Sequence, residues 1–298
     1  MAGDGPRATP TIDRGRVFTL GSTGILNALD LKPGARRWTV DVSAGNDSGQ
    51  PDWGRSSSPL AIDDLVVVSV GGSSGHSLVA YHRDSGAVVW HGGDDAASYS
   101  SPQLLTLAGV RQIVVLNKDS AAGHDVATGR VLWRHEWPRL QPSVAQPLRL
   151  GDDRVIFSAG YGNGSRALQI SAKGDGLEAR LLWESTRMKA KFASLVQYEG
   201  HVYGLDDGVL ASLDPATGER PWKAGRYGHG QLLLAGGVLL VQTEDGELVL
   251  VEPRPDAHRE LTRFRVFERK TWNPPALAGR RLIVRNDAEA ACYELPVR

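Results

Sequence analysis

Residues 210–222 read LASLDPATGERPW, an apolar stretch that enters the turn DPATG and continues toward Trp222. Short polar side chains bond to local backbone groups and glycine accepts a positive φ, so this stretch predicts two strands joined by a tight hairpin. The pattern recurs as ALDLKPGARRW at 28–38, AYHRDSGAVVW at 80–90 and GHDVATGRVLW at 123–133, with a degenerate copy at 168–183. The hairpin is therefore a repeated module.

The tryptophans that end these modules recur at a regular spacing. They are Trp38, Trp90, Trp133, Trp183 and Trp222, separated by 52, 43, 50 and 39 residues. Such a period is typical of stacked structural repeats. A tryptophan at the end of each repeat can wedge between adjacent sheets and bury on the order of 200 Å². We expect these five residues to dock neighbouring sheets.

Each repeat opens with small residues, often followed by proline, and contains four short apolar stretches separated by turn residues. Four antiparallel strands per repeat form the blade of a β-propeller, so the sequence predicts an all-β propeller in one domain. Residues 177–196 resemble an amphipathic helix in isolation, but the repeat phase places strands there. The expected blades are 8–42, 54–92, 98–137, 143–185, 190–225, 229–268 and 271–298, the last incomplete.

Composition excludes several classes of function. The 298 residues contain 34 basic and 34 acidic side chains, which argues against bulk electrostatic capture of nucleic acid or an anionic membrane. No apolar run is long enough to span a membrane, and the first residues, MAGDGPRATP, lack the apolar stretch of a signal peptide. Cys292 is the only cysteine, so no intrachain disulfide is possible; we expect it to be buried.

With openings of the type Ser-Pro and closings of the type D-x-x-T-G-x-x-x-W, the chain resembles the PQQ-like (pyrroloquinoline-quinone-like) β-propeller repeat family over nearly its whole length. That family includes quinoprotein alcohol dehydrogenases and non-catalytic BamB-like propellers of outer-membrane β-barrel assembly. The resemblance implies a location in the bacterial periplasm or envelope. It also implies eight blades, whereas seven are visible here, so either the seventh blade stays three-stranded or the chain is a truncated eight-bladed propeller.

The quinoprotein resemblance implies a quinone held between a tryptophan and a vicinal Cys-Cys disulfide, with Ca²⁺ bound by acidic and amide side chains. A single cysteine excludes that disulfide. Trp272 is a candidate to stack on the quinone, and Asp206 or Asp207 to bind calcium, although acids in turns are usually solvated. We therefore expect no cofactor and no metal site, and keep PQQ with calcium as the alternative.

The repeat phase brings the residues before each inner strand, and those between the second and third strands, to one mouth of the central channel. Trp53 and Trp272 also lie at openings, outside the repeat position of the other tryptophans. Basic and aromatic groups on this mouth favour an anionic or planar ligand. The candidate ligand-binding residues are Arg7, Arg55, Tyr99, Lys191, His229, Trp272, Trp53 and Tyr161. The competing interpretation is that these polar loops only face water.

The sequence thus predicts a monomeric binding or scaffold module, without catalytic residues, that engages a protein partner or a small anionic ligand at this mouth. The alternative is a PQQ-dependent alcohol dehydrogenase.

Overall fold

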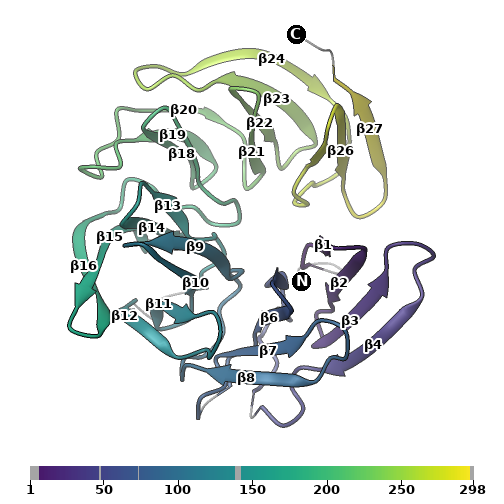
Figure 1. Cartoon of the computed structure of the whole chain (residues 1–298). Helices are drawn as coiled ribbons and strands as arrows, with labels where there is room; N and C mark the ends of the chain where they lie inside the picture. The colour runs from purple at the N-terminus through teal and green to yellow at the C-terminus, as the bar shows by residue number, and fades with distance from the viewer. Residues whose placement is uncertain (1–6, 47, 73, 138–141, 296–298) are drawn as a thin grey trace. The chain divides into compact units, whose positions relative to one another are not determined.

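The computed structural model of the chain describes residues 7–46, 48–72, 74–137 and 142–295. These residues form six four-stranded sheets and one three-stranded sheet, and no helix (Figure 1). In every sheet the strands lie side by side in chain order or its reverse. The predicted all-β class and the seven repeated sheets, the last incomplete, are confirmed. Residues 177–196 contain strand rather than helix, because the repeat phase outweighs the local amphipathic pattern.

The chain divides into two compact units, and the first contains the residues up to Phe157 together with Leu168–Leu181. It holds the first three sheets. Their strands are β1 (Thr11–Asp13), β2 (Arg16–Leu20), β3 (Ile25–Asp30), β4 (Arg36–Asp41), β5 (Leu60–Ile62), β6 (Leu65–Ser69), β7 (Leu78–His82), β8 (Val88–Gly92), β9 (Gln103–Leu107), β10 (Val110–Leu116), β11 (Ser120–Asp125) and β12 (Val131–Glu136).

The second unit contains Ser158–Ala167 and the residues from Leu182 onward, and holds the last three sheets. The fourth sheet has strands in both units: β13 (Leu148–Leu150), β14 (Arg154–Ala159), β15 (Gly164–Lys173) and β16 (Gly176–Ser185). The remaining strands are β17 (Val196–Tyr198), β18 (His201–Asp206), β19 (Val209–Leu213), β20 (Trp222–Arg226), β21 (Gln231–Ala235), β22 (Val238–Gln242), β23 (Glu247–Glu252), β24 (Arg259–Arg265), β25 (Ala276–Ala278), β26 (Arg281–Arg285) and β27 (Ala290–Glu294).

The D-x-x-T-G hairpins close through the aspartate side chain. Asp125 Oδ1 accepts hydrogen bonds from the backbone N–H of Ala127 at 3.1 Å and of Thr128 at 2.8 Å, and from the Thr128 hydroxyl at 2.7 Å. Gly129 then takes a φ of 73°, which reverses the chain into β12. The residue types of the module are therefore those that its backbone geometry requires.

The indole N–H of four repeat tryptophans donates to a backbone carbonyl in the hairpin of the following sheet, which ties successive sheets together. The pairs are Trp38 with Arg83 at 2.8 Å, Trp90 with Val126 at 3.1 Å, Trp183 with Pro215 at 3.0 Å and Trp222 with Arg254 at 3.0 Å. Trp133 differs because the next hairpin, between β15 and β16, lacks the D-x-x-T-G module. Its indole N–H donates to Gln112 Oε1 in its own sheet, and its ring contacts Phe157, with 6.5 Å between centroids.

Serine hydroxyls at the repeat openings link neighbouring inner strands of the first unit. The backbone N–H of Thr9 donates to Ser58 Oγ, and that of Ser58 donates to Ser101 Oγ, each at 2.9 Å. Ser100 Oγ donates in turn to the Ala145 carbonyl at 2.9 Å. The Ser-Pro openings therefore satisfy backbone groups of adjacent strands that no ladder partner reaches.

The seventh sheet packs one face on the sixth sheet and exposes the other. Leu282 and Val284 of β26 are buried in one apolar cluster with Leu248 and Phe267. Cys292 of β27 points to the opposite side and is exposed, so the expectation that it is a buried residue is wrong. On the second sheet the equivalent residues Val67 and Ala80 are buried against Ile113 and Val115 of the third sheet, whereas among the described residues no further sheet follows the seventh.

Candidate functional site

The predicted mouth residues separate into two groups, one in each compact unit. In the first unit, the rings of Trp53 and Tyr99 lie 5.7 Å apart between centroids, and the Trp53 backbone N–H donates to the Tyr99 hydroxyl at 3.4 Å. Trp53 is 47% exposed. Arg7, the first described residue, is half-buried. This group offers one exposed aromatic surface.

Arg55 does not join an exposed cluster. Its side chain is buried, and it donates to the Val70 carbonyl at 2.7 Å, to the hydroxyls of Ser43 and Ser48 at 3.1 and 2.9 Å, and to the Gly49 carbonyl at 3.2 Å. Burial lowers the pKa of its guanidinium. Arg55 therefore ties loops together rather than presenting a charge to a ligand, which corrects the sequence-based placement at an exposed mouth.

The second unit brings four predicted residues together around Phe192. Lys191 Nζ lies 4.5 Å from the centroid of the Tyr161 ring and 5.4 Å from that of Phe192. The Phe192 ring contacts His229 and Trp272, with centroid distances of 5.5 and 5.3 Å. We call Tyr161, Lys191, Phe192, His229 and Trp272 the Lys191 cluster.

The repeat phase explains why these residues meet. Lys191 and Phe192 precede β17, His229 precedes β21 and Trp272 precedes β25, so they occupy equivalent openings of three successive sheets. Tyr161 comes from the turn between β14 and β15, where it adopts a φ of 56°. Phe192 was the residue of this group that the sequence did not single out, although it stands beside Lys191 in the same opening.

Glu244 holds two members of the Lys191 cluster in place. Its Oε1 accepts from the Trp272 indole N–H and its Oε2 from the His229 backbone N–H, both at 2.9 Å. Burial alone would raise the pKa of Glu244, but these two hydrogen bonds, with His229 and Lys270 nearby, bring it below its ordinary value. Lys270 Nζ lies 4.4 Å from the Trp272 ring centroid. The ring of Trp272 is thereby fixed by an anion and flanked by a cation.

His229 supplies a neutral imidazole beside a charged lysine. Its Nε2 lies 3.5 Å from Lys191 Nζ. Burial, and next the positive charge of Lys191, lower the pKa of His229. A neutral ring can accept a hydrogen bond from the Lys191 ammonium through Nε2, which gives the lysine side chain a defined direction.

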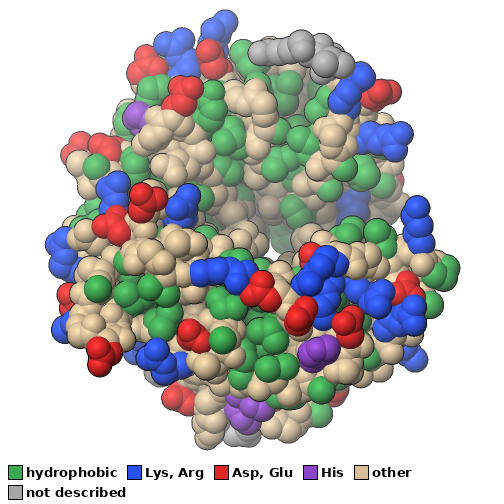
Figure 2. Space-filling view, viewed as in Figure 1, with side chains coloured by type: hydrophobic (Ala, Val, Ile, Leu, Met, Phe, Trp, Pro, Cys, Tyr) green, Lys and Arg blue, Asp and Glu red, His purple; other side chains and the backbone are tan. Residues whose placement is uncertain are grey.

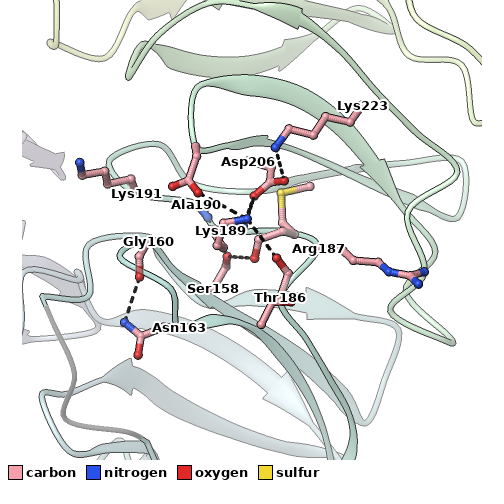
Figure 3. Close-up of polar contacts among 12 residues, drawn as sticks. Ser158, Gly160, Asn163, Thr186, Arg187, Lys189, Ala190, Lys191, Asp206 and Lys223 are labelled. Atoms are coloured by element: carbon pink, nitrogen blue, oxygen red, sulfur yellow. Dashed lines mark hydrogen bonds and ion pairs between the residues drawn. The ribbon is translucent and has the colours of Figure 1, made fainter.

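Asp206 anchors the opening that carries Lys191. It is fully buried, and its carboxylate contacts Lys189 Nζ at 2.7 Å and Lys223 Nζ at 2.6 Å (Figure 3). The same carboxylate contacts Arg220 Nη1 at 2.7 Å. Burial opposes its ionisation, yet the hydrogen bonds from Lys189 and Lys223 lower the pKa of Asp206 overall. One anion thus meets three cations, and the interpretation of Asp206 as a solvated turn residue is wrong.

The same network fixes the backbone of the opening. The Lys189 N–H donates to Asp206 Oδ1 at 3.0 Å, and the Ala190 N–H donates to Ser158 Oγ at 3.0 Å. A Cβ at Gly160 would lie 2.8 Å from Lys191 Cβ, so only glycine lets this loop approach. Figure 3 shows the Lys191 side chain extending away from the Asp206 carboxylate.

The residues that the quinoprotein alternative would need are engaged in other contacts. Among the described residues, no group of three His, Cys, Asp or Glu side chains is placed to hold a metal ion. Both Asp206 oxygens are already occupied by cations, and the Trp272 ring packs against Phe192. These residues therefore do not fit a quinone with calcium. In the part of the chain that is described, no helix has the length and apolar character needed to cross a membrane.

Comparison with known proteins places this geometry in a family. The family model described as "Outer membrane protein assembly factor BamB" matches residues 2–224 and 123–263. A protein of that name from Shewanella oneidensis is 27% identical over 224 residues, which cover 71% of this chain and 51% of the relative. The chain therefore matches about half the length of that relative.

Solved structures share the fold. BamB from Moraxella catarrhalis superposes with a TM-score of 0.71 at 18% sequence identity, covering 96% of this chain and 81% of that one. The computationally designed Ika8 protein gives a TM-score of 0.52 at 12% identity, covering 96% and 95%. The repeats, the all-β sheets and the family match agree: this chain belongs to the family of the outer membrane protein assembly factor BamB, with its PQQ-like β-propeller repeats.

Proposed function

We propose that this chain is a non-catalytic binding module of the bacterial envelope that engages a protein partner during the assembly of outer-membrane proteins. The family match and the printed name of the Shewanella relative support the process and the compartment. The Lys191 cluster supports the binding role, and it is the observation that carries the proposal.

The composition of the Lys191 cluster favours a protein partner. Protein interfaces concentrate their binding energy in a few aromatic and basic side chains. Here Tyr161 is 38% exposed and its ring lies beside the Lys191 ammonium. Glu244 and Asp206 hold the surrounding backbone and rings by hydrogen bonds, so little conformational entropy is lost on docking. An acidic segment with an apolar or aromatic neighbour is the partner chemistry that this surface matches.

Site-specific photo-crosslinking in the native host tests the proposal. A benzoyl-phenylalanine that replaces Tyr161 should crosslink to another outer-membrane assembly protein, identified by mass spectrometry. The same group in place of Leu261, which is 44% exposed on β24, is the control. Addition of Lys191→Ala should reduce the Tyr161 crosslink. Equal crosslinking from the two positions, or none from Tyr161, would speak against a docking role.

Titration of the purified chain with PQQ, with and without Ca²⁺, tests the alternative of a quinoprotein dehydrogenase. We expect no saturable heat, because the carboxylate that could bind calcium is neutralised by lysine and arginine. Saturable, calcium-dependent binding would instead support the enzyme and justify a screen of alcohol substrates.

A further inference from the structure

The first unit contains an open cavity that lies apart from the Lys191 cluster. Its volume is about 350 Å³, within the range of about 300–1,000 Å³ that is usual for small-molecule sites. All of its lining residues belong to the first unit. The polar ones are Thr9, Thr11, Ser58, Ser101, Gln103 and Gln146. The first unit therefore has a hollow of ligand size with a largely polar wall.

The repeat phase explains this wall. The residue before the opening proline is polar in each of the first four sheets, and all four of these residues line the cavity: Thr9, Ser58, Ser101 and Gln146. Thr11 and Gln103, the first residues of β1 and β9, add a second polar level. Pro59 and Pro102 give the wall apolar patches between the polar groups.

Two serine hydroxyls in the wall have a proton left to donate. Ser58 Oγ accepts the Thr9 backbone N–H and Ser101 Oγ accepts the Ser58 backbone N–H, each at 2.9 Å. Among the residues that the structure describes, neither hydroxyl donates to an acceptor. Ser101 is only 7% exposed, so its free donor is a buried group at the cavity. Because a buried donor without an acceptor costs free energy, a ligand oxygen at this position is favoured.

Gln103 supplies the complementary acceptor. Its Nε2 donates to the Pro102 carbonyl at 3.1 Å, and its Oε1 receives no hydrogen bond from a described residue. An amide oxygen has two lone pairs and can accept from a ligand hydroxyl. None of the lining residues is acidic, basic or histidine. The wall therefore matches an uncharged ligand that both accepts and donates hydrogen bonds.

An exposed aromatic pair stands beside the same openings. Tyr99 lies two residues before Ser101, and Trp53 lies five residues before Ser58. The Ser56 hydroxyl donates to the Tyr99 carbonyl at 3.3 Å, which ties the two openings together. The Trp53 ring is exposed and rests against Tyr99. The face of an indole carries partial negative charge, so it attracts the C–H groups on one face of a sugar ring.

We propose that this cavity binds a neutral mono- or disaccharide. Sugar oxygens accept from the hydroxyls of Ser58 and Ser101, sugar hydroxyls donate to Gln103 Oε1, and the Trp53 indole stacks on a sugar ring at the entrance. A saccharide combines the two properties of the site, since it is uncharged with many hydroxyl groups and has apolar ring faces. This binding is a function beyond the docking of a protein partner and uses no residue of the Lys191 cluster.

Ligand-observed NMR titration of the purified chain with two neutral disaccharides, maltose and N,N′-diacetylchitobiose, tests the proposal. We expect saturable binding of at least one of them. The capped tripeptide N-acetyl-trialanine amide is the comparison, because it is also uncharged but has neither hydroxyl groups nor sugar rings. It should bind more weakly than the preferred disaccharide. Binding of neither disaccharide, or tighter binding of the tripeptide, would overturn the proposal.

A substitution that fills the cavity locates the binding site. Thr9 lines the cavity and is exposed, so Thr9→Trp adds bulk there without disturbing the core, and it should abolish saccharide binding. Thr262→Trp adds the same bulk at an exposed position of β24 and should bind normally. Lys191→Ala should also bind normally, which separates this site from the docking surface proposed above. Saccharide binding that survives Thr9→Trp, or that Thr262→Trp also removes, would contradict the site.

Three milder substitutions test the assigned contacts. Ser101→Ala removes the buried donor and Gln103→Leu removes the acceptor, and each should weaken saccharide binding by roughly threefold to tenfold. Trp53→Ala should weaken it as well, through loss of the stacking surface. Because Ser101 also accepts a backbone N–H, the melting temperature of each variant is measured beside its affinity. Wild-type affinity in all three variants would overturn the assignment.

Discussion

At the scale of single residues, the glycines of three hairpins, Gly86, Gly129 and Gly218, each carry two constraints at once. Gly86 has a φ of 71°, and a Cβ there would lie 2.9 Å from the ring of Trp38, which belongs to the preceding sheet. Gly218 stands in the same relation to Trp183, at 2.6 Å. The glycine therefore permits both the turn of its own repeat and the docking of the neighbouring tryptophan.

A comparison of Gly86→Ala with Gly109→Ala separates the effect of the tryptophan contact from the effect of backbone strain. Gly109 has a φ of 74°, and a Cβ added there would meet no atom within 4 Å, so Gly109→Ala tests strain only. We expect Gly109→Ala to lower the free energy of unfolding by about 1–2 kcal/mol. Gly86→Ala should lower it by about 1–3 kcal/mol more, because the added methyl group displaces the Trp38 ring. Equal losses in urea denaturation would show that the tryptophan contact is dispensable.

His124 links stability to pH. It is buried, and its Nδ1 lies 3.0 Å from the Gly129 carbonyl, to which the neutral ring donates. Burial lowers the pKa of His124, although the contact with Gly129 opposes this shift. The unfolded chain therefore takes up a proton near pH 6.5 while the folded chain does not, and the free energy of unfolding falls as the pH drops below that value.

The expected loss attributable to His124 is at most about 2 kcal/mol between pH 7 and pH 5. Urea denaturation of the wild type and of His124→Gln at both pH values measures how steeply the free energy of unfolding depends on pH. This slope should be smaller for the variant, which lacks His124. It should not vanish, because His91 and His229 remain in both proteins. Identical slopes would mean that the folded chain admits the proton on His124.

At the scale of elements, the tryptophans of five fourth strands, β4, β8, β12, β16 and β20, join each of these sheets to the next. Trp133 is buried and contacts Phe157 of β14, whereas Trp53 lies in a loop and is 47% exposed. Trp133→Ala should therefore reduce the free energy of unfolding by about 3–5 kcal/mol. Trp53→Ala, the matched control, should change it by less than about 1 kcal/mol. A melting temperature of Trp133→Ala equal to that of the wild type would contradict docking between sheets.

The four-stranded repeat also explains which structural features could be predicted from the sequence. The hairpin modules and tryptophan spacings report local geometry, so the sheets and their order followed from them. Asp206 was missed because its three cations lie 14–17 residues away in the chain and meet it only in the folded sheet. Arg55 was misplaced because an opening residue can turn inward when backbone carbonyls and hydroxyls satisfy its guanidinium.

At the scale of the whole molecule, charge collects locally although its total is zero. Equal numbers of acidic and basic side chains give a formal net charge of zero, and Figure 2 shows the two kinds interspersed over the viewed face. Within the second unit, however, Lys189, Arg220 and Lys223 surround one buried carboxylate, and Lys191 stands free of it. A local excess of positive charge therefore accompanies the aromatic rings of the Lys191 cluster.

We propose that a protein partner docks on the Lys191 cluster, and the affinity of the crosslinked partner, once purified, is the most direct measurement of this docking. Its dissociation constant should be compared for the wild type, Lys191→Ala and Lys173→Ala; Lys173 is an exposed lysine of β15 paired with Glu178. We expect Lys191→Ala to weaken binding about tenfold or more, a loss of about 1.4 kcal/mol, with Lys173→Ala unchanged. Equal affinities of all three proteins would contradict the account.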